Sequence, residues 1–185
     1  MTLNYQLRPE DWLRLYKNNL LTPFSELEIK SIQKRYVQFQ RRIRQFSRLG
    51  RKCYLVPYNN NLTADVHTFL ENYFPGDKAG NIDAYENMLS IDWKTINGKN
   101  SFSWIGYLEG TETPVAFYFA GRTGDDSAGF YCGIASRIIP GLPEFLDKQF
   151  LSCLVDEGIR YLNCGGSETF GLHSFKHRLA PVEER

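Results

Sequence analysis

The spacing of apolar residues predicts two helices at the start of the chain. Apolar side chains between Trp12 and Leu20 recur at helical spacing, which predicts a short amphipathic helix over 9–20. After a Thr-Pro break, a second apolar stripe with a period of about 3.6 residues continues to Gly50. Together with a capping box at its start, this stripe predicts a long helix over 25–49.

The middle of the chain has the pattern of strands. A strand is expected over 52–57, with helices following over 63–73 and 83–96. Three runs of β-type residues, separated by turns, then predict consecutive antiparallel strands, at 101–110, 114–121 and 128–134.

The last third of the chain predicts a helix, a strand and a final helix. Pro143 suits a first helical position and Gly158 suits a C-cap, so a helix is expected between them. A strand over 159–164 and a helix over 169–179 complete the pattern. This succession of helices around a meander indicates an α/β fold with a mixed sheet.

Composition limits the possible partners. The 185 residues suit a single domain, and 42% hydrophobic with 15% aromatic residues supply an ample core. Lys and Arg total 22 against 21 Asp and Glu, a net charge of +1, so no field of the whole molecule attracts a polyanion. Any contact with nucleic acid must therefore be local.

The cysteines and the hydropathy pattern favour a cytoplasmic protein without a membrane span or a metal. The four cysteines lie far apart, with no C-x-x-C pair and no cluster at metal-ligand spacing. The N-terminus lacks the pattern of a secretory signal, so we expect reduced thiols. No apolar run reaches the roughly 18 residues that a membrane-spanning helix requires.

Three segments, in order, resemble a known family. They are RYVQFQRRIRQFSRLGRKCYLV (35–56), the passage from AGFYCGI to NCGGSE (128–168), and GLHSFKHRLAP (171–181). Together they resemble the transferase domain of Fem-type peptidyltransferases, within the GCN5-related N-acetyltransferase (GNAT) superfamily. The resemblance implies one acyl-CoA N-acyltransferase (GNAT)-like α/β domain over 51–185, with a mixed, mostly antiparallel sheet flanked by helices. Residues 1–50 would form an N-terminal helical extension packed on it.

The resemblance implies transfer of an acyl or aminoacyl group to an amine, without a metal or a resident cofactor. Fem-type members take the group from charged tRNA, whereas the wider superfamily uses acyl-coenzyme A. The loop that would bind pyrophosphate here reads Arg137-Ile-Ile-Pro140-Gly141-Leu-Pro143. Because proline has no N–H, two donors are missing from a loop that binds by donating, which weakens coenzyme A as the donor.

Lys176 is the first candidate for catalysis. On the predicted last helix it shares a face with His173, and it matches the late Phe-Lys of the family. A lysine there could neutralise a phosphate or the oxyanion of a tetrahedral intermediate. The alternative is a solvated basic residue that suits the end of a helix.

The turn after the strand over 159–164 is the second candidate. Gly165 and Gly166 would allow a ligand to approach the backbone, with Ser167 beside it. Glu168 could then act as general base for the amine or bind it as an ammonium, and His173 is the alternative base. The simpler explanation is a turn with a helix cap.

The resemblance also places a splay between the strands near 128–134 and 159–164, where donor and acceptor would meet. Ile134, Ala135 and Ser136 would lie at its mouth, and a backbone N–H there would hold the donor carbonyl. Ser136 and Arg137 are therefore candidates for substrate binding. Tyr131 could act as an acid or orient the substrate, although an aromatic residue in a strand is usually part of the core.

The densest local charge lies in 34–52, which contains no acid. The candidates for contact with nucleic acid are Arg41, Arg42, Arg44 and Arg48. The alternative is a solvated face whose acidic partners come from the acid-rich region 65–92.

Three functions remain open at this point. The preferred one is an aminoacyltransferase that uses aminoacyl-tRNA and a small-molecule or peptide amine. The second is an acyltransferase that uses a thioester of coenzyme A or of a carrier protein. The third is a non-catalytic protein of the same fold that binds a ligand or partner. The oligomeric state is open, and exposed aromatic residues near the N-terminal helices would suit a homodimer.

Overall fold

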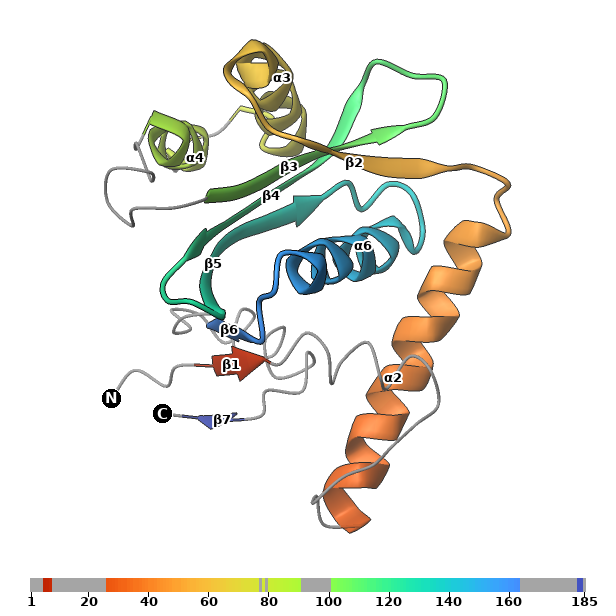
Figure 1. Ribbon diagram of the computed structural model, residues 1–185. Coiled ribbons are helices and arrows are strands. Elements are labelled where there is room, and N and C mark those ends of the chain that lie inside the picture. Colours follow the sequence, from red (N-terminus) through yellow and green to blue (C-terminus); the bar gives the residue numbers. More distant parts are fainter. Residues whose placement is uncertain are drawn as a thin grey trace.

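One mixed sheet organises the part of the chain that the computed structural model describes, namely residues 5–7, 26–76, 78, 80–90, 101–163 and 183–184 (Figure 1). Its strand order is β2-β3-β4-β5-β6-β1-β7. The strands are β1 (Tyr5–Leu7), β2 (Cys53–Pro57), β3 (Ser101–Leu108), β4 (Pro114–Arg122), β5 (Ser127–Ala135), β6 (Tyr161–Asn163) and β7 (Glu183–Glu184). The helices are α2 (Glu26–Ser47), α3 (Thr63–Tyr73), α4 (Asn81–Ser90) and α6 (Leu142–Asp156), with a 3-10 turn, η1, at Asn60–Leu62.

The centre of the sheet is the predicted meander. Strands β2, β3, β4 and β5 pair antiparallel in turn, and α6 then leads the chain to β6, which pairs parallel to β5. Every residue of β4 from Pro114 to Gly121 is buried, because helices cover this strand on both faces. The predicted mixed, mostly antiparallel sheet flanked by helices is confirmed.

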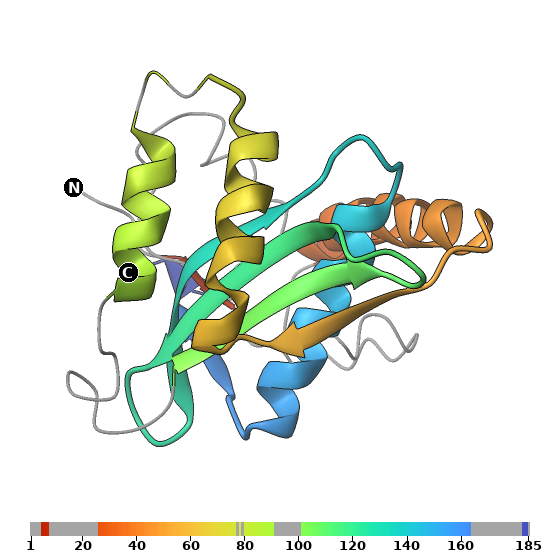
Figure 2. The ribbon, with the colours of Figure 1, turned by 90° about the horizontal axis from the view of Figure 1, so that it is seen from above.

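Two apolar clusters lie on opposite faces of the sheet. Helix α6 covers a cluster that includes Tyr118 and Phe150, whose rings stack with their centroids 4.9 Å apart. Helices α3 and α4 cover the other face, where Phe69 packs with Phe117 and Cys132. Figure 2 shows α3 and α4 side by side over the sheet, with α6 on its opposite side. Alternation along each strand sends successive side chains to the two clusters.

Helix α2 packs beside α6 through a short contact. Ile43 and Phe46 are buried, and the Phe46 and Phe145 rings lie 4.8 Å apart. Gly141, just before α6, has a φ of +79° and lies against the backbone carbonyl of Arg42. A Cβ at this position would collide with that carbonyl, so glycine is what allows α2 to cross the start of α6.

Most of the predicted elements that lie in the described residues are present. The helix over 63–73 is found at those bounds, and the long helix over 25–49 is α2. The predicted helix over 83–96 begins earlier, at Asn81, and residues 91–100 lie outside the description. The predicted helices over 9–20 and 169–179 also lie outside it.

The short strands β1 and β7 were not predicted. β1 has three residues and pairs with both β6 and β7, and β7 has two residues. Segments this short contain too few positions for an alternating pattern to be recognised.

A half-buried acid of α6, Asp147, faces the sheet. The Tyr118 hydroxyl donates a hydrogen bond to Oδ1 of Asp147 at 2.6 Å. Burial raises the pKa of Asp147 to about 7, and the charge of Glu144 raises it further, while the hydrogen bond from Tyr118 opposes the shift. The folded state therefore holds this proton more tightly than the unfolded chain does, where the pKa is about 3.9.

This difference predicts that stability falls as the pH rises. The stabilisation that the bound proton of Asp147 gives to the folded state is complete below about pH 4 and is lost as the pH rises through 7. Asp147→Asn keeps an oxygen that accepts from Tyr118 but cannot ionise. Compared with this variant, the wild-type free energy of unfolding should fall by about 2 kcal/mol between pH 5 and 8, measured by chemical denaturation. Equal pH dependence in the two proteins would contradict the assignment.

Candidate functional site

Strands β5 and β6 run together for only three residues. Ser127, Ala128 and Gly129 pair with Tyr161, Leu162 and Asn163. β5 continues to Ala135, and over 130–135 none of the described strands pairs with its outer edge. We call this arrangement the β5–β6 fork. It lies where the resemblance placed the splay.

Tyr131 lies at the branch point of the fork. The ladder between β4 and β5 shifts register there, because Phe119 pairs with Cys132 whereas Ala120 pairs with Phe130. Tyr131 is the extra residue of this β-bulge, a feature that re-aims side chains. Its ring lies 5.6 Å from that of Phe119, on the α3 and α4 face, and the residue is 39% exposed.

A glycine makes room for the Tyr131 ring. A Cβ on Gly129 would lie 2.9 Å from the phenol oxygen of Tyr131 and 3.0 Å from the carbon that bears it. Gly129 is also the last β5 residue that pairs with β6. The Tyr131 hydroxyl is therefore held over the backbone at the point where the two strands diverge.

Every second backbone N–H group of β5 is directed towards the fork. The Ser136 N–H donates to the Val115 carbonyl at 2.8 Å, on the β4 side. By alternation, Ile134 also faces β4, whereas Gly133 and Ala135 face the outer edge. Of the three residues predicted at the mouth, Ala135 is thus the one whose amide is directed to the fork.

The start of α6 is a poor site for a pyrophosphate. The Leu142 N–H donates to the Ile139 carbonyl at 3.2 Å, and Pro140 and Pro143 have no N–H to offer. Glu144 adds a negative charge in the first turn. The Arg42 carbonyl lies against Gly141. A hydrogen-bond acceptor therefore occupies the start of α6, where a bound pyrophosphate would need N–H donors.

The predicted basic residues of α2 form an exposed stripe. We call Arg41, Arg42, Arg44 and Arg48 the basic stripe. None of the four forms an ion pair with another described residue. The predicted acidic partners from 65–92 are not found in the described part of the chain, since Glu71 and Glu86 pair with His67, and Asp65 accepts from Tyr107.

Of the other candidate residues, only two lie in the described part of the chain. Ser136 is half-buried and Arg137 is exposed, both just after β5. The remaining candidates, which lie outside the described residues, are Lys176, Glu168, His173, Gly165, Gly166 and Ser167. Their placement at the fork remains a prediction.

The described cysteines lack the character of nucleophiles. Burial raises the pKa of the Cys53 thiol to about 12 and raises those of Cys132 and Cys153 as well. A thiol that resists ionisation is a poor nucleophile. All three are free thiols.

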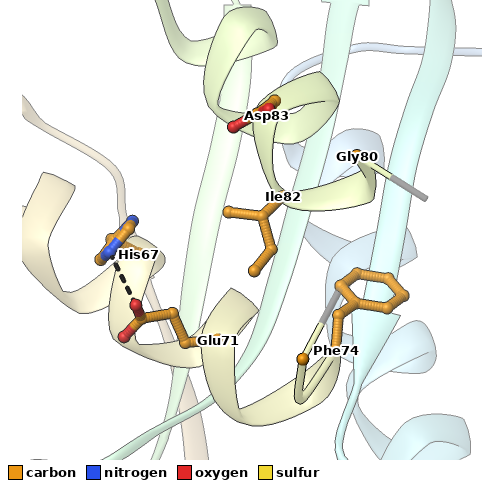
Figure 3. A pocket seen from close by; sticks show the side chains of 7 residues that line it. His67, Glu71, Phe74, Gly80, Ile82 and Asp83 are labelled. Atoms are coloured by element: carbon orange, nitrogen blue, oxygen red, sulfur yellow. Dashed lines mark ion pairs between the residues drawn. The ribbon is translucent and has the colours of Figure 1, made fainter. Parts of the chain in front are cut away.

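A hollow of about 400 Å³ lies at the turn between α3 and α4, and it was not predicted from the sequence (Figure 3). It is lined by His67, Glu71, Phe74, Gly76, Gly80, Ile82 and Asp83. Spacing along α3 could have indicated the pair of His67 and Glu71, which are four residues apart. The contribution of α4 depends on tertiary packing and leaves no local signal.

The described residues contain neither a metal-binding cluster nor a membrane-spanning helix. No group of three or more His, Cys, Asp or Glu side chains there could hold a metal ion. None of the helices in the described ranges has the length and apolar character needed to span a bilayer.

Comparison with known proteins gives similarity at the level of structure. No protein-family model matches the sequence, and no curated protein matches it. A conserved protein of unknown function from Bacteroides thetaiotaomicron is similar, with a TM-score of 0.64 and 14% identity over 99% of this chain. L-PGS from Bacillus licheniformis has a TM-score of 0.57 and 13% identity over 99% of this chain.

A third neighbour is the C-terminal domain of a putative lysylphosphatidylglycerol synthetase from Agrobacterium fabrum, with a TM-score of 0.54 and 13% identity over 100% of this chain. With the meander, the crossover helix and the parallel β6, these likenesses show the fold. It is the mixed, mostly antiparallel sheet flanked by helices that was expected of a GNAT-like domain. The chain spans 57% of the length of each of the three neighbouring chains.

The contact between Gly129 and Tyr131 can be tested by a double-mutant cycle. Gly129→Ala should displace the Tyr131 ring and cost about 1 kcal/mol in the free energy of unfolding, because the added methyl takes the place of the phenol. In a Tyr131→Ala background the same change should cost nothing or stabilise the strand. Chemical denaturation of the four proteins gives the coupling energy. Equal costs in both backgrounds would show that Tyr131 does not lie over Gly129.

Proposed function

We propose that this protein is an acyltransferase that moves an aminoacyl group from a charged tRNA to an amine at the β5–β6 fork. The observation that carries the proposal is the unpaired outer edge of β5 among the described residues, with the Tyr131 hydroxyl at its branch point. An unpaired strand edge offers backbone donors to an extended ligand, and the phenol adds a group that can donate a proton.

The reaction requires no metal. The nitrogen lone pair of the acceptor attacks the ester carbonyl carbon, the bond between this carbon and the ester oxygen breaks, and an amide forms. The amine loses a proton to a base, and the departing ribose hydroxyl gains one. An outward amide of Gly133 or Ala135 would polarise the carbonyl, and Tyr131 would protonate the leaving oxygen.

The predicted residues after β6 have roles in this scheme. Lys176 would stabilise the oxyanion, Glu168 would act as the base with His173 as its alternative, and Gly165, Gly166 and Ser167 would line the acceptor. This division follows from the family resemblance. It requires the chain after Asn163 to return beside the fork.

The start of α6 supports a donor other than coenzyme A. Binding of its pyrophosphate would need N–H groups where Pro140 and Pro143 have none, and would bring the anion towards Glu144. An aminoacyl ester of tRNA has no pyrophosphate, so it does not need N–H donors at the start of α6. The name of one neighbour, a putative lysylphosphatidylglycerol synthetase, describes a product with an aminoacyl group, in keeping with this donor class.

The basic stripe supports a local contact with tRNA phosphates. Arg41 and Arg44 lie on α2, and Arg48 directly follows it, with its N–H donating to the Arg44 carbonyl at 3.0 Å. Their spacings of three and four residues place the three side chains along one side of this helical segment. Exposed guanidinium groups without acidic partners suit bidentate contacts with phosphate. Since the whole chain has a net charge of +1, this stripe would supply the local attraction. We further propose that the protein acts in the cytoplasm, where charged tRNA is available.

A test of the proposal compares donors and removes the phenol. Purified protein is incubated with aminoacyl-tRNA, acyl-coenzyme A or an acyl-carrier-protein thioester plus an amine, and amide formation is followed by mass spectrometry. We expect product from aminoacyl-tRNA, and a loss of kcat of about 100-fold in Tyr131→Phe. Tyr54→Phe, an exposed tyrosine on the far edge strand β2, is the matched control. Product from a thioester alone would exclude the tRNA donor, and no product from any donor would favour a non-catalytic role.

Binding of tRNA to the basic stripe predicts a change in salt dependence. Replacing Arg41, Arg44 and Arg48 by Ala should weaken binding and reduce the slope of log K against log salt concentration by about 2 units. The control is Arg160→Ala, which removes an exposed charge beyond the opposite end of α6. An unchanged slope in the triple variant would contradict a role for the stripe.

A further inference from the structure

His67 links the two helices that cover one face of the sheet. It lies on α3, and its Nε2 is 3.1 Å from a carboxylate oxygen of Glu71, one turn further along the same helix. Its Nδ1 contacts a carboxylate oxygen of Glu86, which lies on α4. One imidazole ring thus bridges a carboxylate of its own helix and a carboxylate of the neighbouring helix.

This geometry requires a doubly protonated ring. A neutral imidazole carries one N–H, so its second nitrogen presents a lone pair. With carboxylates at both nitrogens, one of them would then face that lone pair and lose its hydrogen bond. Only the imidazolium donates in both directions, and the arrangement is therefore that of the protonated state.

The described side chains of α4, from Asn81 to Asn87, are none of them fully buried. Among them, the half-buried Ile82 and Tyr85 pack against the apolar cluster on this face of the sheet. The Tyr85 ring stacks on Phe74 at a centroid distance of 5.7 Å. Because this part of α4 lies near the surface, a charged link to α3 can contribute to its local stability.

We propose that His67 is a pH-operated clasp, which holds α4 against α3 more firmly when protonated than when neutral. His67 and Glu71 also line the hollow between the two helices, with Ile82 and Asp83 of α4 opposite (Figure 3). Loss of the clasp therefore loosens the contact between the two helices that line the hollow. The inference concerns these two helices alone and does not depend on the proposed transferase activity.

The charges around the ring set the direction of the switch. Glu71 on α3 and Glu86 on α4 contact His67, and Asp83 of α4 lines the same hollow. The hydrogen bond and the charge of Glu86, followed by those of Glu71, raise the pKa of His67 above its ordinary value of 6.5. A histidine with a raised pKa supports the folded arrangement at low pH and loses this contribution as the pH rises through that pKa.

Hydrogen exchange measured by NMR tests the clasp. Protection factors, which correct for the intrinsic pH dependence of exchange, are compared at pH 5.5 and 8.5 for amides of α4, with α3 amides as internal reference. In the wild type, α4 should lose protection by about two- to fivefold at the higher pH, as expected for an exposed ion pair, while α3 stays unchanged. In His67→Gln, α4 should have the low protection at both pH values.

Two matched variants separate the clasp from a general effect of charge. Glu86→Gln removes the contact between the helices, so the pH dependence of α4 protection should disappear. Glu71→Gln removes an equal charge from within α3, so the dependence should remain with its midpoint at lower pH. Titration of the His67 ring by NMR supplies each midpoint. Unchanged pH dependence in Glu86→Gln, or equal protection of wild-type α4 at both pH values, would overturn the proposal.

Discussion

The partial pairing of β5 is the constraint on which the rest of the structure depends. On one side β5 pairs with β4 along nearly its whole length, and on the other its ladder with β6 covers three residues. Backbone donors and acceptors need partners, and an edge without a strand leaves them to other groups. The bulge at Tyr131 and the glycine beneath its ring both belong to this divergence. Among the described strands, the sheet is thus continuous as far as β5 and unpaired along the outer edge of β5 over 130–135.

The helices on the two faces of the sheet make different contacts. α6 buries the apolar face on which Tyr118 and Phe150 pack, and α2 crosses its start at Gly141. That crossing places exposed arginines next to the loop after β5, while it brings a carbonyl and not a donor to the helix start. On the opposite face, α3 and α4 are joined by a charged contact through His67. Charged residues therefore lie on the outer sides of the helices that cover the sheet, whereas apolar residues fill the two layers between these helices and the sheet.

The sequence predicted those elements whose signals are local. Helix α3 was found at its predicted bounds because apolar periodicity and a following Pro-Gly break delimit it. The meander was predicted because alternation and turn residues recur along consecutive strands. The short strand β1 was not predicted, since its pairing with β6 depends on residues more than 150 positions away. The contact between Glu86 and His67 left no local signal either, because the two residues lie on different helices, 19 residues apart.

The fork lies where the two strands were expected to part, whereas the functional role of Tyr131 stays a prediction. The reason why Tyr131 lies at the branch point, the register shift opposite Phe119 and the space above Gly129, arises only when the strands pair. The acidic partners suggested for the arginines of α2 are not found among the described residues. Glu71 and Glu86 pair with His67, and they belong to α3 and α4, which lie across the sheet from α2 (Figure 1). Charge balance along a sequence does not determine which charges meet.

The open edge of β5 can be measured directly by hydrogen exchange at single amides. Cys132 and Ile134 donate towards β4, whereas Gly133 and Ala135 face the outer edge. The account predicts an alternating profile, in which Cys132 and Ile134 exchange slowly and Gly133 and Ala135 exchange at least about tenfold faster. Equally slow exchange at all four amides would mean that β5 is paired on both sides, and the fork would then be closed.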